Sequence, residues 1–191
     1  MKLLHIDSSA LGAHSVTREL TAAIVAAKQR QNPTLEVTYR DLAAQPLPHW
    51  TPVADAADPA AVAAQAVMDE FLSADVVVIG APMYNFGIPS SLKAWIDRVM
   101  IAGKTFRYTA NGPEGLAGGR KVIVASARGG FYGAESDIDF QEAYLRHVFG
   151  FIGITDVEFV RAEGIGIGPE QRAKAVNDAH AEIHARLPVA A

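Results

Sequence analysis

The feature of this sequence that most restricts its fold is a regular alternation between strand-like and helix-like patterns. Five short runs are rich in apolar and branched residues, as buried strands are, and they cover Lys2–Ile6, Leu35–Asp41, Asp75–Ala81, Lys121–Ala127 and Thr155–Ala162. Between and after them, apolar residues recur at helical spacing over Val16–Arg30, Ala60–Leu72, Ser90–Met100, Asp139–Phe149 and Glu170–Leu187. The sequence therefore predicts five successive strand–helix pairs.

Strict alternation of this kind predicts an α/β fold with a doubly wound parallel sheet. Parallel neighbours need right-handed helical crossovers, so helices should cover both faces of the sheet. With five strands, the expected order is the flavodoxin-like one, 2-1-3-4-5, counting the predicted strands along the chain. Ligands of such sheets bind outside the carboxyl ends of the strands where the order reverses, here between the first and third strands.

Length and composition favour one soluble globular domain spanning residues 1–191. The chain has 191 residues, of which 50% are hydrophobic and 20% charged, so it can bury one sizeable core but not two comfortable ones. Its net charge of −4 and the lack of any Lys/Arg cluster argue against a nucleic-acid partner. With no cysteine, disulfides, thiolate zinc sites and cysteine nucleophiles are excluded, so any redox chemistry must come from a cofactor.

Nothing in the chain resembles a membrane-spanning or targeting segment. The apolar run after Met1 is too short for a signal-peptide core, and no run approaches the ~18 apolar residues of a spanning helix. We therefore expect a cytoplasmic protein without a membrane partner. No metal site is expected, because His180 and His184 lie four apart without the carboxylate of an H-E-x-x-H pattern.

The loop that follows the first predicted strand is rich in hydroxyl groups and ends in a helix. Ser9, Ser15 and Thr17, with the first free N–H groups of that helix, would make a neutral cradle for a phosphate. An alternative is that Ser15 only caps the helix. Asp7 argues against a phosphate unless its carboxylate points away.

The loop after the third predicted strand carries aromatic residues between two prolines. Pro82 and Pro89 constrain its entry and exit, so Met83–Ile88 should be a short exposed loop. Exposed Met, Tyr and Phe side chains favour a flat ligand that covers them. The alternative is a loop that packs on neighbouring protein, including another subunit.

The loop after the fourth predicted strand, Ser126–Gly133, holds paired glycines followed by aromatics. Gly129 and Gly130 would let backbone N–H groups approach the edge of a ligand, and Phe131 and Tyr132 could form a lid. A plain glycine turn is the alternative. Because the three loops leave neighbouring strands at one sheet edge, they should converge on a single crevice. An anion site, a stacking surface and a hydrogen-bonding edge are what FMN requires.

At these residues the sequence resembles the FMN-dependent NADH azoreductases and quinone reductases of flavodoxin-like fold. The most specific matching residues are Pro82–Lys93, Asp97-Arg98 and Gly103–Phe106, and the resemblance extends from the first strand through Gly130. It implies that FMN is held at three groups of residues. These are Ser9, Ser15, Val16 and Thr17 at the phosphate, Met83, Tyr84, Asn85 and Phe86 along the isoalloxazine ring, and Ala127, Arg128, Gly129 and Gly130 at the other ring edge.

Two positions depart from the family pattern. The family often has a polar residue where Val16 stands and a serine where Ala127 stands. Hydrogen bonds to a cofactor at these two positions would therefore come from the main chain alone.

The resemblance also implies an activity and an assembly. We expect a hydride to pass from NADH, or NADPH, onto FMN, and the electrons then to reduce a quinone in one turn or an azo bond in two. Both partners are planar and would use one flavin face, so ping-pong kinetics are expected, with protons from solvent. The family's dimers imply a homodimer with shared active sites. The substrate slot would be walled by Phe86, Phe131 and Tyr132, with Phe106, Arg107 and Tyr108 reaching in from the second subunit.

Three alternatives stay open at this point. Phe106-Arg107-Tyr108 could be ordinary loop packing. The chain could be an electron-carrier flavodoxin that needs a partner reductase, although such carriers are usually more acidic than this one. A phosphoacceptor signalling domain would need an aspartate where Gly80-Ala81-Pro82 stands.

The G-x-G-x-G run Gly164–Gly168 resembles a dinucleotide-binding loop. It follows the last predicted strand, away from the point where the strand order reverses, so we predict a structural turn.

Overall fold

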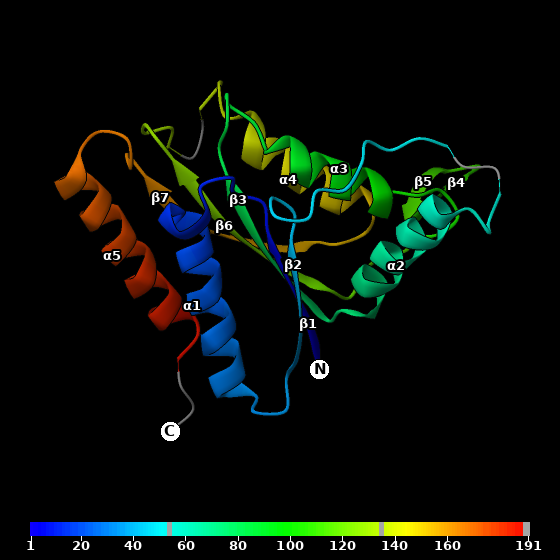
Figure 1. Cartoon of the computed structure of the whole chain (residues 1–191), viewed down its shortest axis with the longest axis horizontal. Helices are drawn as coiled ribbons and strands as arrows, with labels where there is room; N and C mark the ends of the chain where they lie inside the picture. The colour runs from blue at the N-terminus through cyan, green and yellow to red at the C-terminus, as the bar shows by residue number, and fades with distance from the viewer. Residues whose placement is uncertain (53–54, 134–135, 189–191) are drawn as a thin grey trace.

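The computed structural model describes residues 1–52, 55–133 and 136–188 and is built on one central parallel sheet (Figure 1). The sheet has five strands in the order β2-β1-β3-β6-β7, all neighbours parallel. This is the predicted flavodoxin-like order, which is thereby confirmed. The strands are β1 (Lys2–Asp7), β2 (Glu36–Asp41), β3 (Val76–Pro82), β6 (Lys121–Arg128) and β7 (Asp156–Glu163).

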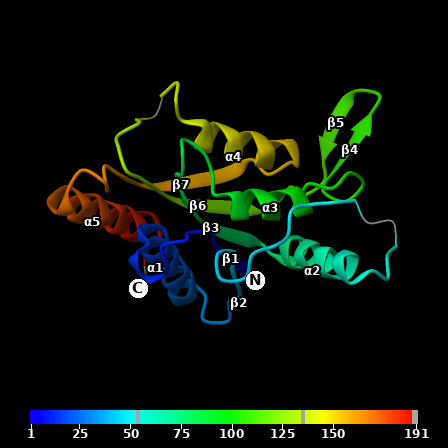
Figure 2. The same cartoon turned by 45° about the horizontal axis from the view of Figure 1, so that its top comes forward.

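Helices cover both faces of the sheet, as predicted (Figure 2). One face packs against α1 (Val16–Gln31) and α5 (Pro169–Arg186). The other face packs against α2 (Pro59–Ser73), α3 (Ser90–Val99) and α4 (Phe140–Phe151). Because successive side chains of a strand point to opposite faces, each buried strand contributes to both apolar layers. The molecule therefore has two cores separated by the sheet.

Side-chain caps explain where the helices begin. Asp58 accepts a hydrogen bond from the Ala60 N–H at the start of α2, where Pro59 takes the favoured first position. At the start of α4, Asp139 accepts from two N–H groups, those of Gln141 and Glu142. The helix predicted from Asp139 therefore begins one residue later, with Asp139 as its cap.

The pairing of Phe71 and Trp95 shows how α2 and α3 are held to the sheet. Both side chains are fully buried, and their rings meet edge to face with centroids 5.6 Å apart. Burying an aromatic side chain of this size contributes roughly 2–3 kcal/mol relative to leaving it exposed. This packing fixes α3, whose first residues follow the aromatic loop.

A β-hairpin after α3 was not predicted. It consists of β4 (Phe106–Thr109) and β5 (Gly112–Gly115), which pair antiparallel. The Phe106 ring packs on Phe151 of α4 with centroids 4.9 Å apart. Gly115 lies so close to Gly153 that a Cβ atom on it would be 2.2 Å from the Gly153 nitrogen. Tertiary contacts, and not an apolar alternation in the sequence, therefore hold this hairpin. A short 3₁₀ helix, η1 (Gly12–His14), also precedes α1.

Among residues 1–52, 55–133 and 136–188, no helix combines the length and the apolar character needed to cross a membrane.

Candidate active site

The three predicted loops meet at the carboxyl edge of the sheet, at the top of Figure 1. The Tyr84 hydroxyl of the β3 loop lies 3.4 Å from the Ser9 hydroxyl of the β1 loop and accepts a hydrogen bond from the Ala10 N–H at 3.2 Å. On the other side, the Met83 N–H donates to the Ala127 carbonyl at the end of β6, at 2.9 Å. The β3 loop thus contacts both neighbours, and the predicted convergence of the loops is confirmed.

The hydroxyl groups of the β1 loop are buried at the start of α1. Ser9, Ser15 and Thr17 are each no more than 5% exposed, and the Ser15 and Thr17 hydroxyl oxygens lie 3.1 Å apart. Ser15 caps α1 by accepting from the Arg18 N–H at 3.3 Å. The earlier N–H groups of a helix have no partner within it, and they carry the positive end of the helix dipole. Ser15 is therefore a helix cap and also part of a cluster suited to an anion.

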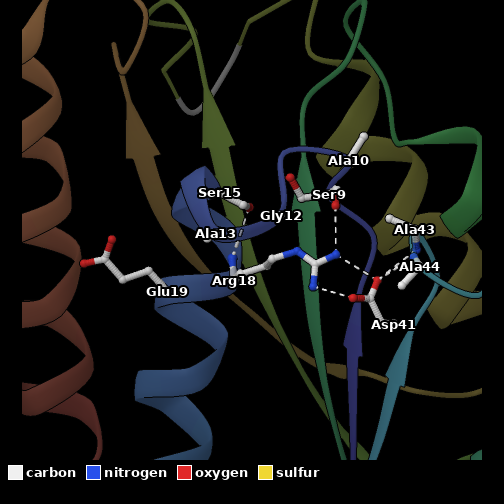
Figure 3. Close-up of a pocket in the computed structure, with 10 residues that line it drawn as sticks. All are labelled: Ser9, Ala10, Gly12, Ala13, Ser15, Arg18, Glu19, Asp41, Ala43 and Ala44. Carbon is white, nitrogen blue, oxygen red and sulfur yellow. Dashed lines mark hydrogen bonds and ion pairs between the residues drawn. The ribbon is translucent and has the colours of Figure 1, made fainter.

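A cavity of about 700 Å³ opens beside this cluster, between the β1 loop and the end of β2. Figure 3 shows the Arg18 side chain crossing beneath the loop toward Asp41. The hydroxyl-bearing residues Ser9 and Ser15 also line this cavity. It gives an anionic group access to the hydroxyls of the β1 loop.

The carboxylate of Asp7 is occupied on the α1 side of the sheet. It accepts from the Thr21 hydroxyl at 2.9 Å and from the Tyr39 hydroxyl at 3.0 Å, and an Arg18 nitrogen lies 3.8 Å away. Burial, together with the neighbouring Asp7 carboxylate, raises the pKa of Tyr39 to about 12, so this hydroxyl stays protonated and donates. The Asp7 carboxylate is thus hydrogen-bonded within the protein, which answers the objection to a phosphate at this loop.

The β3 loop is a tight two-residue turn. Tyr84 and Gly87 exchange both backbone hydrogen bonds at 3.0 Å. The two residues between them, Asn85 and Phe86, have φ angles of 48° and 69°, as a type I′ turn requires. A bulky residue in this region is an outlier that costs of order 1–3 kcal/mol, and such outliers cluster at ligand sites. Phe86 is 47% exposed.

The β6 loop starts later than predicted. Strand β6 continues through Arg128, which pairs with Glu163 of β7, so the assignment of Ser126–Arg128 to the loop is wrong. The Arg128 side chain is fully buried, and its guanidinium contacts the carboxylates of Asp139 and Glu142 at 2.8 Å each and of Glu163 at 3.0 Å. Arg128, and equally the buried Ala127, can therefore face a ligand only through the main chain.

The glycine run Gly164–Gly168 supports the β6 loop from behind. The Gly164 N–H donates to the Gly130 carbonyl at 2.9 Å, and the Gly166 N–H donates to the Gly129 carbonyl at 3.0 Å. A Cβ atom on Gly166 would lie 3.2 Å from the Gly129 backbone. The run is the turn that was predicted, and its glycines allow this close backbone approach. The sequence shows the spacing of these glycines, but it does not show that they contact the β6 loop.

Comparison with known proteins places this arrangement in a family. Residues 1–187 match the family model described as a flavodoxin-like fold. The FMN-dependent NADH:quinone oxidoreductase 1 of Xanthomonas euvesicatoria pv. vesicatoria is 64% identical over 181 residues, which are 94% of this chain and 93% of that protein. The chain belongs to the flavodoxin-like FMN-dependent NADH:quinone oxidoreductase family. The resemblance seen in the sequence is thereby confirmed.

Solved structures agree with membership of this family. The crystal structure of an azoreductase from Bacillus anthracis str. Sterne superposes with a TM-score of 0.88 at 28% identity, covering 98% of both chains. An FMN-dependent NADH-azoreductase from Bacillus anthracis str. Ames Ancestor, solved in complex with FMN, gives 0.88 at 25% identity, again over 98% of both chains. The similarity of fold therefore extends over nearly the whole of each chain.

The crevice fits the cofactor of this family. Its β1 loop offers hydroxyls and helix N–H groups to a phosphate, its β3 turn offers an aromatic wall, and its β6 loop offers a glycine edge. The centroids of the Phe86 and Tyr132 rings lie 6.4 Å apart and the rings are nearly perpendicular, so they meet edge to face between the β3 and β6 loops. The Arg128 guanidinium lies 5.7 Å from the centre of the Tyr132 ring and supports it from below.

The other aromatic residues predicted for the substrate slot do not lie beside Phe86 and Tyr132 in the same chain. Phe131 is 64% exposed, and its ring covers Gly164, where a Cβ atom would meet it at 2.7 Å. Phe106, Arg107 and Tyr108 lie on the hairpin, beyond the end of α3 that is remote from the β3 loop (Figure 2). A helix of ten residues is about 15 Å long. Because α3 separates the hairpin from the β3 loop, the hairpin aromatics do not line the crevice of their own chain.

Sequence reasoning missed Arg18 altogether. Its guanidinium binds Asp41 and the Ser9 carbonyl under the β1 loop. The sequence shows only an arginine three residues after a helix cap. Its partner Asp41 is 23 residues away and comes into reach because β2 lies beside β1.

Proposed function

We propose that this chain is an FMN-dependent NADH:quinone oxidoreductase that also cleaves aromatic azo compounds to amines. The observation that carries the proposal is the meeting of the β1 and β3 loops through Tyr84, which joins the anion cradle to the aromatic turn. The FMN-dependent NADH:quinone oxidoreductases among the relatives support a quinone as substrate, and the azoreductases among the structural neighbours support an azo compound. NADH is the donor that those names give.

Twelve residues would hold the cofactor, as the family resemblance implies. Ser9, Ser15 and Thr17 would bind the phosphate through their hydroxyls, and Val16 through its N–H group. When bound, FMN supplies the redox chemistry by accepting a hydride from NADH and passing electrons to the acceptor. The remaining residues would contact the ring; they are Met83, Tyr84, Asn85, Phe86, Ala127, Arg128, Gly129 and Gly130.

The residues around the slot select the shape of what enters it. Phe86 and Tyr132 meet edge to face where the β3 and β6 loops come together. They would form one wall of a slot for a flat molecule and exclude water from the ring surface. The nicotinamide and the acceptor are both flat, so they would use the slot in turn, which gives ping-pong kinetics. The nearby carboxylates of Asp7, Asp41 and Glu163 are engaged in ion pairs. Protons would therefore come from solvent.

We also propose a homodimer in the cytoplasm with shared active sites. Tyr108 on the hairpin is 74% exposed, which suits a side chain that reaches a second copy. Next to the β3 turn, an apolar groove of about 420 Å³ would be covered by that copy; its lining includes Gly87, Ile88, Phe140 and Tyr144. Neither a nucleic acid nor a membrane is proposed as partner, in keeping with the net charge of −4.

An anaerobic titration tests the proposed activity. The FMN-loaded protein is reduced stepwise with NADH while the flavin absorbance is followed, and a benzoquinone is then added. We expect bleaching by NADH alone and prompt recovery with the quinone. A yellow protein that NADH does not bleach would support the electron-carrier alternative. A protein that does not bind FMN would contradict the whole site assignment.

A second experiment tests the shared site. Tyr108→Ala should lower kcat/KM for a quinone while leaving the FMN dissociation constant unchanged, because the hairpin would act in the partner's slot. The mass of the wild-type protein, measured by sedimentation over a range of dilutions, should be that of a dimer. Full specific activity of a monomer at high dilution would contradict the shared site.

A further inference from the structure

The side chain of Arg18 connects three elements beneath the β1 loop (Figure 3). Its two terminal nitrogens bind the Asp41 carboxylate in a fork, at 2.6 and 2.7 Å. One of them also donates to the Ser9 carbonyl at 2.9 Å, and the other donates to the Tyr39 hydroxyl at 3.1 Å. The side chain is only 18% exposed. A planar guanidinium suits this arrangement because its donors point in fixed directions.

The bond to the Ser9 carbonyl sets the direction of the next peptide group. In a planar trans peptide, the C=O and the following N–H point in opposite directions. Arg18 holds the Ser9 carbonyl below the loop, and the Ala10 N–H accordingly points the other way, toward the Tyr84 hydroxyl in the crevice. If this peptide were flipped, the Ser9 carbonyl oxygen would point into the crevice, where it would repel an anion, and the Ala10 N–H would lose its bond to Tyr84.

Asp41 also orders the backbone on the opposite side of the cavity. Besides the Arg18 fork, its carboxylate accepts from the Ala43 and Ala44 N–H groups at 3.0 Å each. These two alanines line the same cavity of about 700 Å³. The fork therefore shapes both the loop above the cavity and the turn beside it.

Arg18 also supplies the positive charge that two neighbouring carboxylates need. Asp7 is 3% exposed and 3.8 Å from Arg18, and Asp41 is paired directly with it. Hydrogen bonds from Arg18 are the main reason that the pKa of Asp41 is lowered to about 2, so this carboxylate is charged at neutral pH. Glu19 lines the cavity as well and lies 3.0 Å from the His180 ring. Without Arg18, this region would repel a phosphate.

We propose that Arg18 is a positioning residue for the phosphate end of FMN. It acts through the Ser9 carbonyl and the two carboxylates, and it does not itself contact the phosphate. The inference rests on the proposed function, in which the β1 loop holds that phosphate.

The test compares FMN with riboflavin, which has the same ring system and no phosphate. Dissociation constants of both are measured by flavin fluorescence for the wild type and for Arg18→Met. We expect FMN binding to weaken about tenfold or more, the size of effect expected when hydrogen bonds to a charged group are lost. Riboflavin binding should change less than about threefold, because the ring contacts lie on other loops.

Three further variants sharpen the result. Arg18→Lys keeps the charge but loses the fork, and we expect an FMN affinity between those of the wild type and Arg18→Met. If Arg18→Met does not fold, Arg18→Lys carries the same comparison. Combining Arg18→Met with Asp41→Asn removes one carboxylate and should recover part of the FMN affinity. The matched control is Arg40→Met, because Arg40 is also 18% exposed and binds Glu70 in a fork, at 2.6 and 2.9 Å.

The outcomes separate the two proposals. A wild type that does not bind FMN would contradict the proposed function and with it this inference. If the wild type binds FMN, equal losses of FMN and riboflavin affinity in the Arg18 variants would show a purely structural residue and overturn the inference alone. A loss of FMN affinity in Arg40→Met as large as in Arg18→Met would overturn it as well.

Discussion

The hydroxyl of Ser9 lies 3.4 Å from the hydroxyl of Tyr84, although the two residues are 75 positions apart. This contact joins the end of the loop that would hold a phosphate to the turn that would lie along a flavin ring. The Ala10 N–H donates to the same tyrosine oxygen. One side chain thus couples the two halves of the candidate site.

Tyr84→Phe removes this link and keeps the ring. We expect FMN binding to weaken about three- to tenfold, since a hydrogen bond of this kind contributes roughly 0.5–1.5 kcal/mol. The measurement is a fluorescence titration of the apoprotein with FMN. An unchanged dissociation constant would show that the contact does not contribute to cofactor binding.

The strained backbone of Phe86 leads to a second prediction. Phe86→Gly and Phe86→Ala both remove the aromatic wall, so both should lower kcat/KM for a quinone. Only glycine adopts a φ of 69° without a steric cost, so Phe86→Gly should be more stable than Phe86→Ala by about 1 kcal/mol. Urea unfolding of the two apoproteins measures the difference. Equal stabilities would mean that the turn relaxes when the ring is lost.

The ion pair between Arg18 and Asp41 predicts a dependence of stability on pH. Hydrogen bonds from Arg18, and then those from Ala44 and Ala43, lower the pKa of Asp41 from 3.8 to about 2 in the folded protein. A depressed carboxylate pKa stabilises the folded state above the unfolded pKa, and this stabilisation is lost as the pH falls. The wild type should therefore lose it between about pH 4 and pH 2.

The comparison with Asp41→Asn isolates this contribution. At about pH 6 the variant should be less stable than the wild type by roughly 1–2 kcal/mol, and the difference should shrink as the pH approaches 2. Urea unfolding at several pH values measures it. A difference in unfolding free energy that does not change with pH would contradict the assignment of the effect to the Asp41 charge.

The buried ion cluster around Arg128 leads to a fourth prediction. Arg128→Met leaves Asp139, Glu142 and Glu163 without their buried cation, so we expect a loss of about 3–5 kcal/mol of unfolding free energy. The control is Arg146→Met. Arg146 is 51% exposed and also lies near Glu142, at 3.7 Å, and an exposed pair of this kind contributes no more than about 1 kcal/mol. Similar losses in both variants would contradict the prediction.

Much of this site could be predicted because its main parts are local in the sequence. The cluster Ser9, Ser15 and Thr17 and the turn Tyr84–Gly87 each lie within one short stretch of the sequence, and both reach the expected edge of the sheet. Which residues of these loops bind a cofactor stays a prediction. Arg128 was misplaced because its sequence neighbours are glycines and small residues, whereas its three carboxylate partners come from α4 and β7.

The order of the five sheet strands and the main helices, the parallel sheet and the family were all predicted from the amino-acid sequence. Those properties follow from apolar periodicity and from short motifs, which act between near neighbours in the chain. The hairpin, whose Gly115 packs against Gly153, and the fork between Arg18 and Asp41 depend on contacts that form only in the folded chain. These contacts join residues many positions apart, and their energies depend on which strands lie side by side. A local sequence pattern does not reveal such a contact, because the two groups come within hydrogen-bonding distance only when the sheet forms.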